Sequence, residues 1–141
     1  MNIIKKIIKS LFFNKYKILR FFRIILNIDQ KIFIGERKII LPPGHMLSLY
    51  NLIYKEYDEF LPKLALSIKK NESIIDIGAN VGDTLFRLIN KNLNPDYYCV
   101  EADDYFFKYL KKNIESLNLN KNNKIIPIKA LVGNNLVGNL S

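Results

Sequence analysis

A glycine loop between an apolar run and an amphipathic segment is the part of the sequence best suited to chemistry. The run 73–77 is rich in β-branched residues, and Gly78 and Gly82 follow it four positions apart. Helical spacing begins behind this loop. Gly78 allows a sharp turn at the carboxyl end of the strand, and Gly82 allows a ligand or strand to approach the first helical turn. The order strand, loop, helix predicts a ligand site at one edge of a parallel sheet.

Acidic residues accompany this loop. Asp76 ends the first apolar run, and segment 96–101 predicts a second short strand that ends at Glu101, 23 positions beyond Gly78. In a parallel nucleotide-binding sheet, an acid at the tip of the second strand accepts hydrogen bonds from the two ribose hydroxyls. We therefore assign this task to Glu101, and we expect a helix from Tyr105 to about Ser116 behind it.

The loop departs from the two common phosphate-binding patterns. Asn80 occupies the position of the second glycine in the dinucleotide pattern Gly-x-Gly-x-x-Gly, and Asp83 stands after Gly82 where a Walker loop has lysine. Asp83 or Thr84 could cap the helix, and an acid there repels phosphate. The pattern favours a zwitterionic amino-acid adenosine, S-adenosylmethionine. An NAD(P)-binding Rossmann protein is the alternative, and Asn80 disfavours it.

Four segments resemble the FkbM family of S-adenosylmethionine-dependent methyltransferases over about residues 40–138. They are Asp76-Ile-Gly-Ala-Asn-Val-Gly-Asp83, Val100-Glu-Ala-Asp103, Tyr57-Asp-x-Phe-Leu61 and Ala130-Leu-Val-Gly133. The resemblance implies a class I methyltransferase, or Rossmann-like, fold and O-methylation of a glycan or a small hydroxylated metabolite. By position it also implies the cofactor contacts. The methionine side of the cofactor would be lined by Asp76, Gly78, Ala79, Asn80 and Gly82, and the ribose would be bound by Glu101.

The length of the chain departs from this family. Such domains carry seven strands, whereas the sequence offers three for the parallel sheet, at 73–77, 96–101 and 124–130, the last interrupted by Pro127. We expect an incomplete sheet with flanking helices in a truncated chain, with residues 29–141 as the N-terminal part of the methyltransferase domain. A three-stranded parallel sheet leaves an edge and a face uncovered, which predicts self-association.

The sequence assigns no general base and no metal site. His45 or Asp103 could serve as a base for a hydroxyl acceptor, but His45 beside two prolines is more typical of a surface or capping residue. There is one histidine, and the single cysteine, Cys99, lies in an apolar strand. No metal is therefore expected, and the cysteine usage favours a reducing cytoplasm.

The elements before the glycine loop are predicted from turns and prolines. The 141 residues, 49% hydrophobic and 25% charged, suit about one globular domain. Segment 31–41 predicts a β-hairpin around Gly35. Residues 46–70 predict two helices divided by Pro62, with Asp58 or Glu59 capping the second and residues 69–71 near its end.

The net charge of +9 is concentrated in residues 1–28, which contain seven basic residues and no acid. Helical spacing places an apolar side opposite a basic side. Asn14 and Lys15 interrupt the apolar side, so the pattern leaves two structures open: one continuous helix, or two shorter helices with a hinge near 13–16. The apolar positions are Ile4, Ile7, Ile8, Leu11, Ile18, Leu19, Phe22, Ile25 and Leu26.

Two interpretations of this basic amphipathic segment remain open. It is an interfacial helix on an anionic membrane surface, or a helix packed on its own domain or on a partner subunit. We expect no nucleic acid partner, because Phe21 and Phe22 lie with the aliphatic side chains. The segment has no secretory signal pattern and no apolar stretch long enough to span a membrane. We therefore expect a cytoplasmic chain, peripheral on the inner face of a membrane. A non-catalytic fragment that binds membrane or a partner through this helix is the third functional hypothesis.

Overall fold

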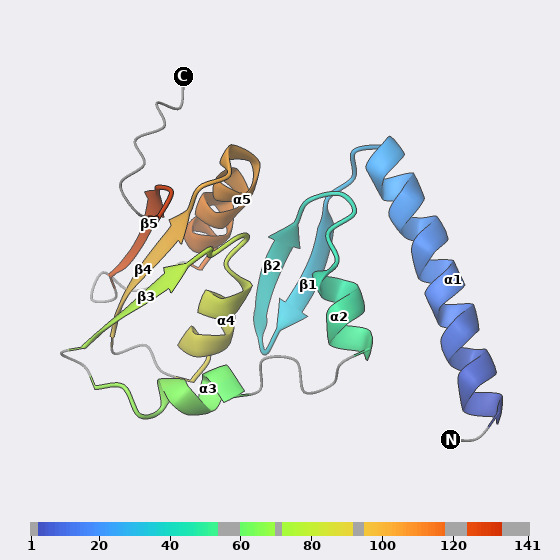
Figure 1. The fold of residues 1–141 in the computed structure, drawn as a ribbon, viewed down its shortest axis with the longest axis horizontal. Coiled ribbons are helices and arrows are strands. Elements are labelled where there is room, and N and C mark those ends of the chain that lie inside the picture. The colour runs from blue at the N-terminus through green and yellow to red at the C-terminus, as the bar shows by residue number, and fades with distance from the viewer. Residues whose placement is uncertain (1–2, 54–59, 70–71, 92–94, 118–123, 134–141) are drawn as a thin grey trace. The chain divides into compact units, whose positions relative to one another are not determined.

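The computed structural model describes residues 3–53, 60–69, 72–91, 95–117 and 124–133 (Figure 1). The chain divides into two compact units, which are described separately. The first contains residues 1–32 and 40–57, and the second contains residues 33–39 and 58–141. Within the described residues, no helix is long and apolar enough to cross a membrane.

Helix α1 (Ile3–Ile25) is the longest element of the first unit. It runs through Asn14 and Lys15 without a break, so the hinge near 13–16 is wrong. Both side chains are exposed. A continuous helix therefore buries neither polar group, and a single Asn in a helix costs well under ~1 kcal/mol.

Polar side chains attach α1 to the loop that follows the hairpin. The Tyr16 hydroxyl donates to the His45 carbonyl at 3.1 Å, and the Arg20 Nε donates to the Gly44 carbonyl at 2.7 Å. Gly44 has a φ of +76°, and a Cβ there would lie 2.6 Å from the Ile24 side chain. The loop therefore needs glycine at this position.

The predicted hairpin and the helix after it are both present. Strands β1 (Gln30–Ile34) and β2 (Arg37–Leu41) form a two-stranded sheet, and helix α2 (Leu47–Ile53) follows. His45 Nδ1 accepts a hydrogen bond from the Leu47 amide at 3.2 Å. The capping interpretation of His45 is thus confirmed.

The second unit contains the predicted parallel sheet. Strands β3 (Ser73–Ile77), β4 (Asp96–Glu101) and β5 (Ile125–Lys129) lie in the order β3-β4-β5. Both pairs are parallel, so all three strands end at the same edge of the sheet. Pro127 lies in β5, which has β4 as its one strand neighbour among the described residues. An outer strand tolerates proline because only one side of it needs hydrogen-bond donors.

Three helices accompany the sheet: α3 (Phe60–Ala65), α4 (Asp83–Ile89) and α5 (Asp104–Glu115). The proposed capping residues of α3, Asp58 and Glu59, lie outside the described residues. The helix ends at Ala65, several residues before the predicted 69–71. Helix α5 begins one residue before the predicted Tyr105 and ends at Glu115.

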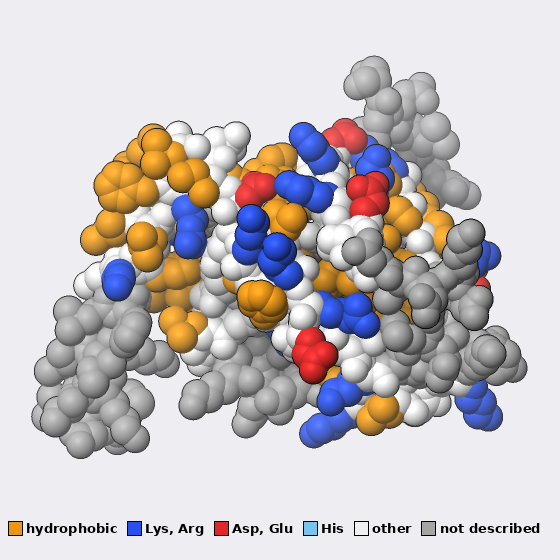
Figure 2. Space-filling view, turned by 180° about the vertical axis from the view of Figure 1, so that it is seen from behind, with side chains coloured by type: hydrophobic (Ala, Val, Ile, Leu, Met, Phe, Trp, Pro, Cys, Tyr) orange, Lys and Arg blue, Asp and Glu red, His pale blue; other side chains and the backbone are white. Residues whose placement is uncertain are grey.

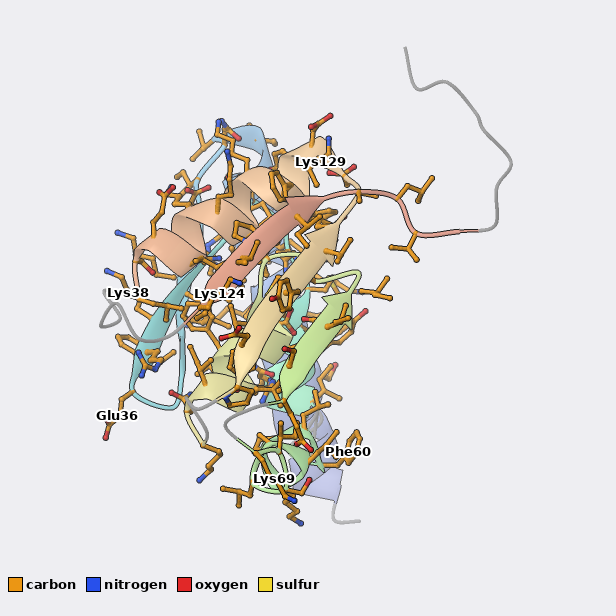
Figure 3. The ribbon with its side chains drawn as sticks, turned by 90° about the vertical axis from the view of Figure 1, so that its left-hand side faces the viewer. Glu36, Lys38, Phe60, Lys69, Lys124 and Lys129 are labelled. Carbon is orange, nitrogen blue, oxygen red and sulfur yellow. The ribbon has the colours of Figure 1, made fainter. Side chains whose placement is uncertain are left out.

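The core of the second unit lies between one face of the sheet and helices α4 and α5. Leu85, Phe86 and Leu110 on these helices are fully buried, as is Cys99 on β4. The opposite face carries exposed apolar side chains on β3, whereas Val100 on β4 is buried. Figure 3 shows the sheet with its side chains, and Lys124 and Lys129 mark the two ends of β5. On β3, the alternate residues Ile75 and Ile77 are more than 60% exposed.

Asn90 joins the tip of the hairpin to the end of α4 within the second unit. Its side-chain amide donates to the Ile34 carbonyl at 2.7 Å, and its Oδ1 accepts from the Arg37 Nε at 3.1 Å. Gly35 has a φ of +60°, and a Cβ there would lie 2.6 Å from the Asn90 amide nitrogen. The close approach of turn and helix therefore depends on Gly35.

Candidate functional site

The loop 78–82 connects β3 to α4 at the carboxyl edge of the sheet. Its backbone enters the left-handed region at Gly78 (φ 80°), Asn80 (φ 49°) and Gly82 (φ 91°). The amides of Gly78 and Ala79 both donate to the Val100 carbonyl on β4, at 2.9 Å each. These bonds fold the loop back over the end of the neighbouring strand.

The two glycines have different roles. A Cβ on Gly78 would meet no atom of the described residues within 4 Å, which leaves space for a ligand beside it. A Cβ on Gly82 would lie 3.1 Å from the Leu110 Cδ1 atom of α5. Gly82 therefore permits the approach of a helix within the protein, where the sequence left open a ligand or a strand.

The start of α4 differs from the prediction. The helix begins at Asp83, its N-cap is Gly82 in a left-handed conformation, and no side chain caps it. The prediction that Asp83 or Thr84 caps the helix is therefore wrong. Because the turn at Gly82 places Asp83 inside the first helical turn, its carboxylate adds negative charge at the loop instead.

Glu101 lies at the tip of β4 and joins the two loops of this edge. Its Oε2 atom accepts a hydrogen bond from the Asn80 amide, and its Oε1 atom accepts one from the Asp103 amide, both at 2.8 Å. The side chain is only 9% exposed. A carboxylate has about four lone-pair positions, so two remain for hydroxyl donors.

Asp76 is the electrostatically unusual group of the site. Its Oδ2 atom is buried and has no hydrogen-bond partner among the described residues. Burial raises the pKa of Asp76 from 3.8 to about 6, and the negative charges of Asp83 and Glu101 add to the shift. Burial beside this carboxylate also raises the pKa of the Cys99 thiol to about 12. A buried carboxylate without a hydrogen-bond partner among the described residues, next to two other acids, favours a ligand that brings positive charge or hydrogen-bond donors.

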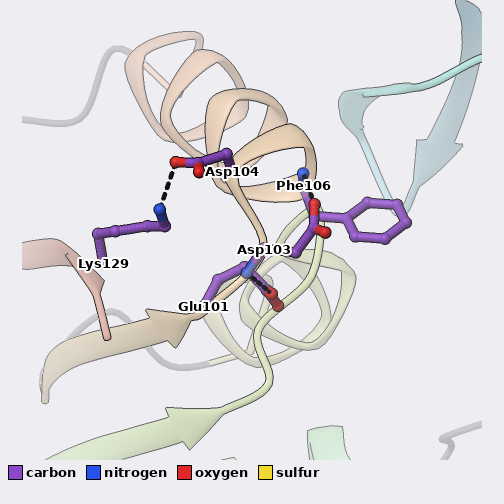
Figure 4. A network of polar contacts seen from close by, with 5 residues as sticks. All are labelled: Glu101, Asp103, Asp104, Phe106 and Lys129. Atoms are coloured by element: carbon purple, nitrogen blue, oxygen red, sulfur yellow. Dashed lines mark hydrogen bonds and ion pairs between the residues drawn. The ribbon is translucent and has the colours of Figure 1, made fainter. Parts of the chain in front are cut away.

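Asp103 is occupied by the helix that it starts. Its side chain accepts from the Phe106 amide at 3.0 Å and caps α5. The next residue, Asp104, forms an ion pair with Lys129 at the end of β5 (Figure 4). Because the Asp103 carboxylate serves as a cap, we do not assign it as a general base.

Asn113 on α5 is a site residue that the sequence analysis missed. Its side chain is fully buried, and its amide donates to the Val81 carbonyl at 2.8 Å, which holds the middle of the glycine loop. The sequence signal that could have identified it is its position three residues after Leu110, which places a polar side chain on the apolar stripe of the helix.

The fold brings the predicted site residues to one edge of the sheet. Asp76 and Glu101 lie near the ends of adjacent strands, and the four loop residues lie beside them: Gly78, Ala79, Asn80 and Gly82. Ala79 is buried, and its amide donates to the Val100 carbonyl. Among the described residues, no three His, Cys, Asp or Glu side chains form a metal-binding group.

Comparisons with known proteins identify the fold. No family model matches the sequence, and no curated protein matches it. Among solved structures, M. jannaschii TYW2 in complex with AdoMet matches with a TM-score of 0.55 at 20% identity, over 74% of this chain and 44% of that one. A SAM-dependent methyltransferase from Agrobacterium tumefaciens matches with a TM-score of 0.48 at 9% identity, over 71% of this chain and 31% of that one.

A third solved structure, tRNA (m1A58) methyltransferase TrmI from Aquifex aeolicus, matches with a TM-score of 0.40 at 20% identity, over 73% of this chain and 52% of that one. The chain therefore spans less than half the length of the TYW2 structure. At this level of identity the likeness establishes architecture. The described sheet and helices have the class I methyltransferase, Rossmann-like fold predicted from the sequence.

Proposed function

We propose that the chain is an S-adenosylmethionine-dependent methyltransferase, with residues 29–141 as the N-terminal part of that domain. The observation that carries this proposal is the buried, unpartnered Oδ2 atom of Asp76, whose pKa is raised to about 6 beside Asp83 and Glu101. S-adenosylmethionine, whose sulfonium and ammonium groups outweigh its one carboxylate, would offset part of the negative charge of this cluster. A pyrophosphate would add negative charge to it.

The geometry of the site supports a role for each residue in this proposal. Asp76 would face the cationic methionine portion, and Gly78, with open space beside it, would let that portion approach the loop, whose Ala79 and Asn80 amides hold its shape through bonds to β4. Gly82 would act indirectly by letting α5 pack under the loop. The two remaining lone-pair positions of Glu101 would accept the ribose hydroxyls.

When bound, S-adenosylmethionine supplies the methyl group and its leaving group, so the protein mainly orients the acceptor and excludes water. We propose an FkbM-type O-methylation of a glycan or a small hydroxylated metabolite, which rests on the resemblance at 76–83 and 100–103. No nucleic acid acceptor is proposed. A hydroxyl acceptor would also need a base, and we assign none among the described residues.

The test is calorimetry of the full chain with S-adenosylmethionine, and with NAD in a parallel titration. We expect the chain to bind S-adenosylmethionine and not NAD. The Gly78→Val variant should lose this binding, because the valine side chain fills the open space and strains a left-handed backbone. Glu115→Gln, an exposed acid on α5, is the matched control and should bind normally. Binding of NAD without S-adenosylmethionine would establish the dinucleotide alternative.

We also propose a cytoplasmic location, peripheral to the inner face of a membrane through residues 1–28. The absence of acids in this segment supports the proposal. A non-catalytic chain that keeps only this surface is the second functional candidate. It would show vesicle binding without binding S-adenosylmethionine or NAD.

A further inference from the structure

In its described part, helix α1 faces the loop after the hairpin with two polar side chains and with Ile24. The groups that attach it to the loop after the hairpin are Tyr16 and Arg20, which are four residues apart and therefore on the same side of the helix. Tyr16 also exchanges a hydrogen bond with the Ser48 hydroxyl at 2.9 Å. A surface helix of a globular protein normally buries its apolar side, whereas most of the described apolar side chains of α1 are exposed and its hydrogen bonds to the unit come from Tyr16 and Arg20.

The apolar side chains of α1 and the turn after it are left exposed. The outer face of α1 consists of six residues that are 45–60% exposed: Ile18, Leu19, Phe21, Phe22, Ile25 and Leu26. At 100° per residue, Ile18, Phe22 and Ile25 lie opposite Tyr16 and Arg20. Figure 2 shows hydrophobic side chains gathered over the part of α1 whose side chains are described, with basic side chains beside them.

Charge selects the occupant of this face. Residues 1–28 carry seven basic side chains and no acid, and the exposed Lys17 ammonium lies 4.5 Å from the Phe13 ring centroid, beside the apolar surface. Packing α1 against α1 of a second copy would bring two uncompensated basic segments together. An apolar surface that also carries negative charge would accept the apolar side chains of α1 and attract its basic ones, so this repulsion would not arise.

We propose that the outer face of α1 inserts into the interfacial region of a bilayer that contains anionic lipid, with the rest of the first unit on the solvent side. The apolar side chains would lie at the acyl boundary, and Lys15 and Lys17 would extend to the headgroups. The polar attachment through Tyr16 and Arg20 is what allows α1 to present this face outward while it remains attached to the protein. The proposal deepens the peripheral membrane location proposed above, on which it rests, and is independent of the cofactor site.

The experiment is co-sedimentation of the full chain with vesicles of phosphatidylcholine alone and of phosphatidylcholine mixed with phosphatidylglycerol. We expect stronger binding to the anionic vesicles and weaker binding in high salt. The double variant Phe21→Gln with Phe22→Gln should weaken binding at least about tenfold, because it removes two apolar side chains from the outer face. Phe33→Gln on β1, an equally exposed phenylalanine outside α1, is the matched control and should bind normally.

A second variant tests the charge. Lys15→Gln with Lys17→Gln should weaken binding to anionic vesicles about thirtyfold and leave binding to neutral vesicles nearly unchanged. Circular dichroism melting should be unaltered in both double variants because all four side chains are exposed. Equal binding of wild type and the phenylalanine variant would overturn the proposal. Failure to bind anionic vesicles, with self-association that the phenylalanine variant abolishes, would also overturn it and would assign the face to a second copy.

Discussion

The Glu101 carboxylate accepts a hydrogen bond at 2.8 Å from the amide of Asn80, 21 residues earlier in the chain. With the second bond, from the Asp103 amide, it joins the glycine loop to the start of α5. In Glu101→Ala both amides lose their acceptor, and we expect the free energy of unfolding to fall by about 2 kcal/mol in urea denaturation. Calorimetry should show loss of S-adenosylmethionine binding at a temperature where the variant remains folded.

The control for Glu101 is a neighbouring acid that faces solvent. Asp104 is 92% exposed and pairs with Lys129, and exposed ion pairs contribute at most about 1 kcal/mol. Asp104→Ala should therefore lose less stability than Glu101→Ala and bind the cofactor normally. Wild-type stability in Glu101→Ala would contradict the role given to its two hydrogen bonds.

The raised pKa of Asp76 makes stability depend on pH. Between about pH 4 and pH 6 the folded state holds a proton that the unfolded state has lost, so the free energy of unfolding falls as the pH rises through this window. In Asp76→Asn this part of the pH dependence should disappear, and the variant should be more stable than wild type at pH 7. Urea denaturation at several pH values measures both effects.

The same group couples pH to ligand binding. A cationic ligand stabilises the ionised form of Asp76, so the affinity for S-adenosylmethionine should rise between pH 5 and pH 7 and level off above the pKa of about 6. Asp76→Asn should bind weakly at every pH, although it is the more stable protein. A variant that binds as tightly as wild type, with the same pH profile, would show that Asp76 does not face the ligand.

The two glycines of the loop should separate binding from stability. Both have positive φ, but a Cβ meets Leu110 at 3.1 Å only at Gly82. Gly78→Ala should cost about 1 kcal/mol from backbone strain, and Gly82→Ala should cost more because α5 must also shift. In calorimetry, Gly78→Ala should show the larger loss of affinity relative to its loss of stability. The reverse order would place the ligand beside Gly82.

Asn113 should act on the loop without touching a ligand. In Asn113→Leu the buried Val81 carbonyl loses its donor, and we expect the free energy of unfolding to fall by about 2 to 3 kcal/mol. Lys108→Leu, an exposed position on the same helix, is the control and should change stability by less than about 0.5 kcal/mol. Similar stability for the two variants would mean that the buried hydrogen bond contributes little.

The sequence predicted the sheet, and the meeting of the proposed site residues at one edge of it, because their signals are local. The β-branched run before Gly78 and the acid at the tip of β4 fix the strand ends, and the parallel arrangement then brings both to one edge. The sequence did not predict the N-cap of α4. That error arose because Gly82 is left-handed and is itself the N-cap, and the close packing against Leu110 that favours glycine there involves a residue far along the chain.

Long-range contacts also explain the other differences. Asn113 was missed because its partner, the Val81 carbonyl, is a backbone group 32 residues away with no signature of its own. The hinge in α1 was predicted because Asn14 and Lys15 fall on the apolar side of the helix. The structure attaches the polar side, so these residues interrupt nothing that is buried.

The open face of β3 should control self-association. Ile75 and Ile77 are more than 60% exposed on the side of the sheet away from Asp76, and among the described residues β4 is the one strand neighbour of β3. An exposed apolar strand with an unpaired edge favours pairing with another chain. Ile75→Lys with Ile77→Lys should therefore shift the full chain toward monomer in sedimentation velocity, and calorimetric binding of S-adenosylmethionine should persist because the substituted side chains point away from the site. Leu52→Lys on α2, another exposed apolar position, is the control and should leave the sedimentation profile unchanged. If the wild-type chain is monomeric at all concentrations, or if the control variant dissociates it equally, the β3 face is not the contact.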